Sequence, residues 1–356
     1  MGGALSHIRI CDFTGQLAGA GATKFLAAFG AQVIRIEDPS NHGQWDILRG
    51  APPFVDKRRG PEFGVGFNNH NVEKLGISLN LRKPKAKELL TELVKVSDVV
   101  SENFAAGVLD RMGFGYEALK TIKDDIIYVS NCGFGHVGPY EKFKSWGPIA
   151  QAVSGMTFQS GLPDEPPAGW GYSYMDHTGG YSMAIAILGA LYHKAKTGEG
   201  QFVDVSCTEF GAALNGPAVL DWSVNGRGLR RDGSPNSNRS LGRNMAPHGI
   251  YPTASEPASA LDGLGETDVW IAISCRNDAE WSALAHLVGE DWALVDRFAS
   301  LAGRLANEDE LDKEIIRFTE TRGRFELAAT LRGLDVPASA VLRPAERIDG
   351  QSQGAD

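Results

Sequence analysis

The chain has 356 residues, of which 42% are hydrophobic and 22% are charged, a composition typical of a globular protein large enough for two domains. Its formal charge of −9 argues against general nucleic-acid binding, because phosphate contacts need clustered Lys and Arg. No run reaches the roughly 18 apolar residues of a membrane span, and the N-terminus lacks a basic-then-apolar signal peptide. We therefore expect a cytoplasmic protein that binds neither nucleic acid nor a membrane.

The first 135 residues alternate strand patterns with helix patterns. We expect strands at 7–13, 32–36, 77–81, 98–100 and 126–130, and helices at 19–29 and 84–96. Strands that alternate with helices predict an α/β fold with a parallel, doubly wound sheet. Ligand sites in such sheets lie at the carboxyl ends of the strands.

A glycine-rich turn follows the first expected strand. Gly15, Gly19 and Gly21 give the spacing GxxxGxG, whereas dinucleotide-binding turns need GxGxxG so that the backbone can approach a pyrophosphate. The spacing therefore argues against a bound NAD.

The segment 171–181 contains Asp176 and His177, followed by Gly179 and Gly180. The apolar run 183–192 after it predicts a buried helix. A carboxylate at this junction lies near the positive end of the helix dipole and near N–H groups that the glycines leave free, which can bind a developing oxyanion. The pattern suits a nucleophile, and the alternative is that Asp176 only caps the helix.

The second half of the chain changes composition after the segment 197–206, in which we expect a tight turn that leads into a strand. Residues 225–247 are rich in Gly, Asn, Ser and Arg, which predicts a linker or a long functional loop. Strand patterns at 249–252, 269–274 and 336–342, with a helix pattern at 278–288, predict a second compact α/β unit.

The four cysteines lie far apart in the sequence. Cys11, Cys132, Cys207 and Cys275 form no CxxC pair, and three of them fall in strand-like runs. This pattern is typical of reduced, buried thiols. We expect no disulfide and no metal site.

Several short segments together resemble family III CoA-transferases, a family that includes formyl-CoA transferases, carnitine CoA-transferases and α-methylacyl-CoA racemases. They occur in the family's order and span nearly the whole chain: Asp12-Phe13-Thr14, 30–37, Asn80, Ser101-Glu102-Asn103-Phe104, 109–114, Gly133-Phe134-Gly135, 171–181 and 197–201. The resemblance implies that Asp176 is a covalent nucleophile that moves CoA from an acyl-CoA donor to a carboxylic acid acceptor, through an aspartyl anhydride and an aspartyl-CoA thioester.

The resemblance also implies the groups around the nucleophile. Gln16 in the Gly15-Gln16-Leu17 turn, together with Gly179 and Gly180, is expected to stabilise oxyanions. Formyl-CoA transferases carry Gln at the position of Leu17, one residue later. They also carry Arg at the position of Asp38. Their glycine-rich substrate loop is replaced here by residues 241–247, and for this reason oxalate is not the expected substrate.

Coenzyme A enters as the acyl-CoA substrate, and the resemblance assigns its contacts to Asn103, Phe104, Arg111, Met112 and Lys144. Arg and Lys suit phosphates, while Phe and Met suit the adenine face. The alternatives are a surface ion pair for Arg111 and core packing for Phe104 and Met112. Neither a metal nor NAD is expected.

Two rival functions differ in chemistry. Racemases of this family move an α-proton with a His and an Asp. Their His aligns with Gly147, which cannot act as a base. His177, beside Asp176, is expected instead to be structural or to orient the substrate. The other rival is a non-catalytic CoA-binding partner subunit, against which the intact Asp176 argues.

The fold implied by the resemblance is a large Rossmann-like domain plus a smaller α/β domain. We expect the large CoA-binding and catalytic domain at 1–224, the linker and small domain at 225–335, and at 336–356 the incomplete start of a segment that returns to the large domain. The expected assembly is an interlocked homodimer, and a heteromer with a related subunit is the alternative.

Overall fold

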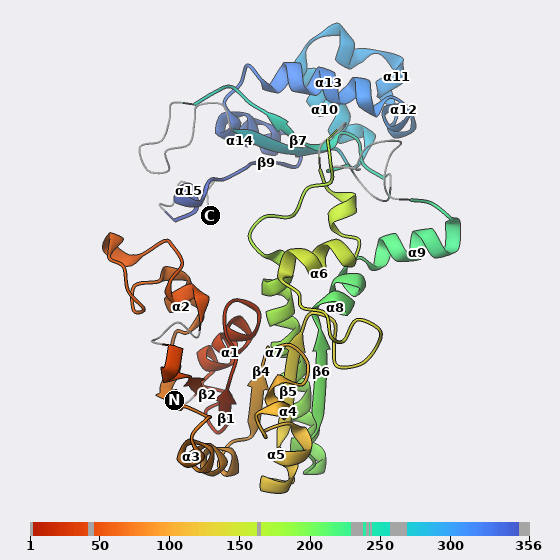
Figure 1. Cartoon of the computed structure of the whole chain (residues 1–356). Helices are drawn as coiled ribbons and strands as arrows, with labels where there is room; N and C mark the ends of the chain where they lie inside the picture. Colours follow the sequence, from red (N-terminus) through yellow and green to blue (C-terminus); the bar gives the residue numbers. More distant parts are fainter. Residues whose placement is uncertain are drawn as a thin grey trace. The chain divides into compact units, whose positions relative to one another are not determined.

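The computed structural model describes residues 3–41, 46–161, 165–228, 238–239, 242, 244–256 and 269–348. The chain divides into two compact units (Figure 1). The first unit comprises Met1–Ser160 and Pro167–Gly228, and the second comprises Gly161–Pro166 and Leu229–Asp356. Much of the expected linker at 225–247, and residues 349–356 of the expected return segment, lie outside the described residues.

The first unit is built on a six-stranded sheet in which every pair of neighbours is parallel, in the order β3-β2-β1-β4-β5-β6. This confirms the predicted parallel α/β sheet. The order is that of doubly wound nucleotide-binding sheets, and it reverses between β1 and β4, where such sheets bind ligands. The strands are β1 (Arg9–Asp12), β2 (Gln32–Glu37), β3 (Leu75–Ser78), β4 (Val99–Glu102), β5 (Ile127–Cys132) and β6 (Phe202–Ser206).

Helices cover both faces of this sheet. Successive strand residues point to opposite faces, so Ile10 joins the apolar cluster under α1 (Ala18–Ala28) and α7 (Tyr174–Thr197), while Cys11 joins the cluster under α3, α4 and α5. The latter helices are α3 (Pro84–Lys95), α4 (Val108–Arg111) and α5 (Tyr116–Ile122).

The other helices of the first unit lie in the connections that surround the sheet. They are η1 (Pro39–Asn41), η2 (Ile47–Arg49), η3 (Val55–Lys57), α2 (Val65–His70), α6 (Gly147–Val153), η4 (Thr157–Gln159), α8 (Cys207–Leu214) and α9 (Gly216–Asn225).

Helix α7 begins nine residues earlier than the sequence predicts, at Tyr174 instead of residue 183. Gly179 and Gly180 therefore lie inside the helix and not before it. Glycine is a poor helix former, but here it permits close packing: a Cβ on Gly180 would be 2.6 Å from the carbonyl oxygen of Ala18, and one on Gly179 would be 2.7 Å from Sγ of Cys207. Tertiary packing thus outweighs local propensity.

The second unit contains a three-stranded antiparallel sheet in the order β7-β8-β9. Its strands are β7 (His248–Pro252), β8 (Trp270–Ser274) and β9 (Ala338–Ala340). Its helices are α10 (Asp278–Val288), η5 (Asp291–Leu294), α11 (Asp296–Ala299), α12 (Leu301–Ala306), α13 (Glu308–Thr319), α14 (Arg324–Gly333) and α15 (Pro344–Ile348). Helix α10 has the bounds that the sequence predicts. Strand and helix residues share one apolar core.

Among the helices of the described ranges, none combines the length and the apolar character that crossing a membrane requires.

Candidate active site

A pocket of about 310 Å³ opens at the carboxyl ends of β1, β4, β5 and β6. The loops after β1 and β4 both contribute to it, so it lies at the point where the strand order reverses. Five of the predicted site residues line it together: Gln16, Asn103, Phe104, Lys144 and Asp176.

Asp176 lies in the first turn of α7, with its carboxylate against Gly147. The Gly147 N–H donates to Oδ2 of Asp176 at 3.2 Å. A Cβ on Gly147 would be 2.4 Å from that oxygen and 2.7 Å from Cγ. The carboxylate therefore occupies the space that a side chain at residue 147 would fill, and only glycine permits this arrangement.

The surroundings of Asp176 make its charge costly. Burial raises the pKa of the carboxyl above its ordinary value of 3.8, while hydrogen bonds from Ser173 and the Gly147 N–H, and the nearby His177, act to lower it. Ser173, which precedes the helix, has a left-handed backbone with φ of 47°, a conformation rarely adopted outside glycine. A partly desolvated carboxylate beside an open pocket is suited to nucleophilic attack.

Gln16 lies in a left-handed turn after β1, with φ of 57°. The side chain of Asn103 holds the preceding residue from both sides: its Oδ1 accepts the Gly15 N–H at 2.8 Å, and its Nδ2 donates to the Gly15 carbonyl at 3.1 Å. Asn103 therefore joins the loops after β1 and β4 and is engaged with protein atoms as well as lining the pocket.

Asp46 holds the same turn through hydrogen bonds and an ion pair. Its Oδ2 accepts the Gln16 N–H at 2.8 Å and pairs with Arg35 at 2.8 Å, and its Oδ1 accepts the Leu48 N–H at 2.9 Å. Both side chains of the ion pair are buried, with 0% of Asp46 and 2% of Arg35 exposed. The strained turn at Gln16 is thus fixed by a rigid, fully desolvated contact.

The expectation that Gly179 and Gly180 offer free N–H groups is wrong. They occupy the sixth and seventh positions of α7, where N–H groups donate to carbonyls one turn earlier in the helix. Their role in the structure is close packing. Below them, Asn131 at the end of β5 donates to the Gly179 carbonyl at 3.1 Å and accepts from Cys207 Sγ at 3.2 Å.

The predicted CoA contacts separate into two groups. Phe104 and Lys144 line the pocket, and Glu102 fixes the Phe104 backbone by accepting its N–H at 2.6 Å. Arg111 and Met112 do not line the pocket. Arg111 is exposed beside Gly107, and Met112 packs partly against the core under α3 and α5.

His177 does not line the pocket either. Its ring lies between the rings of Tyr172 and His70, with centroids 5.8 Å and 5.7 Å away. Burial lowers the pKa of His70 below its ordinary value. The structural or orienting role expected for His177 stays a prediction.

One group of side chains has the donors of a metal site. The ligand atoms of Cys132, His136 and Asp204 lie within 4.8 Å of one another. Two of the three already have protein partners: Nε2 of His136 is 2.8 Å from Ser130 Oγ, and Oδ2 of Asp204 accepts the His136 N–H at 2.7 Å. Because protein contacts account for this arrangement, we assign no metal to it.

Sequence reasoning missed the partners of the predicted residues. Nothing local connects Gly147 or Asp46 with residues that lie about 30 positions away in the chain. Asn131 carried a usable signal, since a polar residue directly after a buried strand belongs at the ligand-binding edge of a parallel sheet.

The whole chain also matches known proteins. The model of CoA-transferase family III matches residues 5–355. The chain is 33% identical to a formyl-CoA:oxalate CoA-transferase of Rhodopseudomonas palustris, covering 98% of this chain and 81% of that one. It is 32% identical to a succinyl-CoA:mesaconate CoA-transferase of Haloarcula marismortui, covering 98% and 82%.

A solved structure gives the same result at the level of the fold. The crystal structure of a CAIB/BAIF family protein from Brucella suis superposes with a TM-score of 0.84 at 29% identity, covering 98% of this chain and 86% of that chain. On these matches, the chain belongs to CoA-transferase family III.

Proposed function

We propose that this protein transfers CoA from an acyl-CoA donor to a carboxylic acid acceptor, with Asp176 as the covalent nucleophile. The observation that carries the proposal is the setting of Asp176: its partly buried carboxylate fits against Gly147 and borders a pocket of about 310 Å³. Membership of a family whose named members are CoA-transferases supports it.

The reaction then proceeds by exchange of activated acyl bonds. The Asp176 carboxylate attacks the donor thioester, which forms a mixed anhydride and releases CoA thiolate. The thiolate attacks the aspartyl carbonyl, which frees the donor acid and leaves an aspartyl-CoA thioester. The acceptor carboxylate attacks that thioester to form a second anhydride, and the thiolate finally takes the acceptor acyl group and restores Asp176.

Each step develops negative charge on a carbonyl oxygen. The glycines of α7 do not supply donors, so the donors in this proposal are the Gly147 N–H and the Gln16 side chain. The Gly147 N–H contacts the Asp176 carboxylate, and Gln16 lines the same pocket. Pre-positioned donors of this kind typically contribute 10²- to 10³-fold to the rate.

The racemase alternative lacks its His in this pocket: residue 147 is glycine, the room for its side chain is filled by Asp176, and no His is among the described residues that line the pocket. The two chemistries separate in deuterium oxide. Transfer without a proton step leaves the α-carbon of a chiral acyl-CoA unlabelled, whereas enzyme-dependent deuterium uptake would favour the racemase.

The proposed acceptor is a carboxylic acid, without restriction to one compound. The two named relatives act on oxalate and on mesaconate, whereas Phe143 and Trp146, which line the pocket, have 58% and 55% of their surface exposed and favour a bulky acyl group. We would therefore screen donors against acids that include oxalate, mesaconate and aromatic carboxylates, and detect the product thioesters by mass spectrometry.

Lys144 and Arg111 provide a matched test of where CoA binds. Lys144 lines the pocket and has no ion pair among the described residues, whereas Arg111 lies outside the pocket lining. Replacing Lys144 with Ala removes a charge-assisted contact, which is expected to weaken CoA affinity about tenfold. Arg111→Ala is expected to change it less than twofold. The opposite order would assign the phosphates of CoA to Arg111 instead.

The assembly in this proposal is a homodimer. Helix α7 exposes an apolar row at helical spacing, in which Tyr181, Ile185, Leu188 and Tyr192 have 50%, 67%, 42% and 67% of their surface exposed. Such a row favours a protein partner. Light scattering on the purified chain separates a homodimer from a chain that needs a related second subunit.

A cytoplasmic location is proposed because the cysteines are buried and unpaired.

A further inference from the structure

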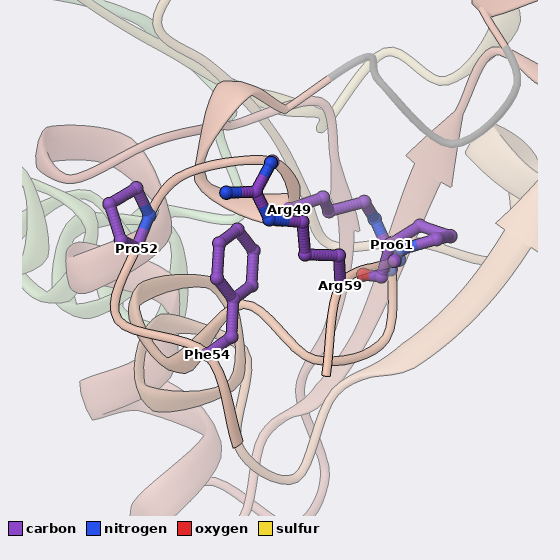
Figure 2. A pocket seen from close by; sticks show the side chains of 7 residues that line it. Arg49, Pro52, Phe54, Arg59 and Pro61 are labelled. Carbon is purple, nitrogen blue, oxygen red and sulfur yellow. The ribbon is translucent and has the colours of Figure 1, made fainter. Parts of the chain in front are cut away.

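A second pocket, of about 430 Å³, lies in the loop region that follows β2 (Figure 2). We call it the arginine pocket, because Arg49 and Arg59 are the charged side chains among the described residues that line it. Its remaining walls include Phe54, Pro52 and Pro61. No acidic side chain is among the described residues of this lining, although Glu37 and Glu62 pair with Arg49 from outside it. The pocket therefore combines a paired arginine, an unpaired arginine and an apolar wall.

Arg49 is held rigidly at the pocket. Its Nη2 donates to both carboxylate oxygens of Glu37, at 2.9 and 3.0 Å. Its Nη1 donates to the Pro61 carbonyl at 2.9 Å and to Oε1 of Glu62 at 3.2 Å. The guanidinium carbon lies 3.6 Å from the centre of the Phe67 ring. Its Nε is buried and has no hydrogen-bond partner among the described residues.

Arg59 differs from its neighbour Arg58. Arg58 pairs with Asp56 at 3.3 Å and lies over the Phe63 ring at 4.2 Å. Arg59 is exposed and, within the described ranges, makes no ion pair and no hydrogen bond. With Lys57 these two arginines form three consecutive cations in a chain whose formal charge is −9, which is a local concentration of positive charge.

We infer that the arginine pocket binds an oxyanion, a carboxylate or a phosphate, at the guanidinium of Arg59, beside the fixed side chain of Arg49. Guanidinium groups match both anions with paired N–H donors. The apolar wall of Phe54, Pro52 and Pro61 suits the carbon body attached to such an anion. Arg49 is pre-positioned by Glu37, so ligand binding has to order only Arg59.

Two sources of this anion exist if the proposed function holds, and the inference about the source rests on that function. One is a phosphate of CoA, and the other is the carboxylate of a substrate acid. Binding of a simple anion does not depend on any reaction, so the site itself can be tested apart from catalysis.

The test compares Arg59→Gln with Arg58→Gln in the full chain. Both variants remove one exposed cation from the same loop, but only Arg59 lines the pocket. The probes are inorganic phosphate, CoA, dephospho-CoA without its 3′-phosphate, oxalate and benzoate, each titrated by calorimetry. We expect Arg59→Gln to weaken at least one probe about tenfold, the effect of one charge-assisted contact, and Arg58→Gln to change every probe less than twofold.

The pattern of losses identifies the source. A loss for CoA but not for dephospho-CoA assigns the 3′-phosphate, an equal loss for both assigns another phosphate, and a loss for oxalate or benzoate assigns a substrate acid. Equal affinities of wild type and Arg59→Gln for every probe would overturn the inference, as would equal losses in both variants. Asp176→Asn, titrated in parallel, should bind the anions with wild-type affinity, since the pocket does not depend on the nucleophile. A wild-type protein that binds anions but transfers no CoA would refute the proposed function and leave the anion site intact.

Discussion

Each unit withdraws a charged side chain wholly or partly from solvent, and the two side chains differ in how completely the charge is satisfied. In the second unit Arg304 is 0% exposed, and each nitrogen of its guanidinium donates: Nε to the Ala246 carbonyl at 2.6 Å, Nη1 to the Phe298 carbonyl at 2.9 Å, and Nη2 to Asp278 at 2.9 Å. In the first unit Asp176 receives the Gly147 N–H at 3.2 Å and a hydrogen bond from Ser173, and burial raises its pKa. A saturated charge supports a fold, whereas an undersatisfied charge beside a pocket is suited to chemistry.

The largest expected effect is on the reaction itself. Asp176→Asn keeps the shape of the side chain but removes the nucleophile, so the rate of CoA transfer should fall roughly 10³-fold or more. Steady-state assays with a donor found in the acceptor screen measure this. A variant that retains more than a tenth of the wild-type rate would show that Asp176 is not the nucleophile.

The same variant should gain stability at neutral pH. The pKa of Asp176 is raised by folding, so the folded state holds its proton more tightly than the unfolded state, and ionisation at pH 7 costs free energy of folding. The advantage of Asn is therefore full above the raised pKa and disappears as the pH falls through that value toward 3.8. Denaturant unfolding at pH 7 and at pH 4 measures the difference, and an advantage that grows on acidification would contradict the account.

Arg304→Met should affect only stability. It leaves the carbonyls of Ala246 and Phe298 without their buried donor, which is expected to cost about 3 kcal/mol of unfolding free energy. Arg317→Met is the control, since Arg317 has 70% of its side chain exposed and pairs with Glu314 one turn earlier in α13 of the same unit; its effect should be small. Equal losses in the two variants would remove the distinction between a saturated buried charge and an exposed one.

Gly147→Ala should impair transfer by steric displacement of the nucleophile. The added methyl would lie 2.4 Å from Asp176 Oδ2, and we expect kcat to fall roughly 10- to 100-fold with CoA affinity changed less than twofold. Gly333→Ala in α14 is the control, because a Cβ there meets nothing within 4 Å; it should leave kcat unchanged. Equal kcat values in wild type and Gly147→Ala would refute the contact.

The smallest expected effect concerns Asp46, which holds Gln16 without lining the pocket. Asp46→Asn should lower kcat about fivefold, because the negative charge that accepts the Gln16 N–H is lost. In a Gln16→Ala background the same change should cost little more, since the group that Asp46 positions is already gone. If the two substitutions instead lowered kcat by independent factors that multiply in the double variant, Asp46 would act through general stability. Unfolding measurements on the wild type, the two single variants and the double variant would then show a lower free energy of unfolding wherever Asp46 is replaced.

The sequence predicted the parallel sheet and a ligand site at the carboxyl ends of its strands because both follow from local patterns; the catalytic role of Asp176 stays a prediction. Alternating strands and helices fixed the expectation of a parallel sheet, and the segment around Asp176 is contiguous. The sequence-based prediction placed the start of α7 too late. Gly179 and Gly180 allow close packing against Cys207 and Ala18, which are distant in the chain, so no local pattern reveals why glycine occurs inside this helix. The Gly147 contact and the Asp46 contact to Gln16 were likewise not predictable, since both join separate loops.

The predicted CoA contacts illustrate the same limit within one short segment. Phe104 and Arg111 are seven residues apart, yet Phe104 lines the pocket and Arg111 does not. The loop after β4 carries Phe104 to the pocket, while α4 begins at Val108 and leads away from it. Spacing along the chain does not reveal where such a turn directs each side chain.

The most direct test of the account is the identity of the residue that becomes acylated. The protein is incubated with a donor acyl-CoA and no acceptor, trapped with hydroxylamine, digested and examined by peptide mass spectrometry, with Asp176→Asn as the control. The account predicts a hydroxamate on Asp176 alone, formed only in the presence of the donor. A wild type that transfers CoA while Asp176 stays unmodified, or a trapped adduct on any other residue, would contradict it.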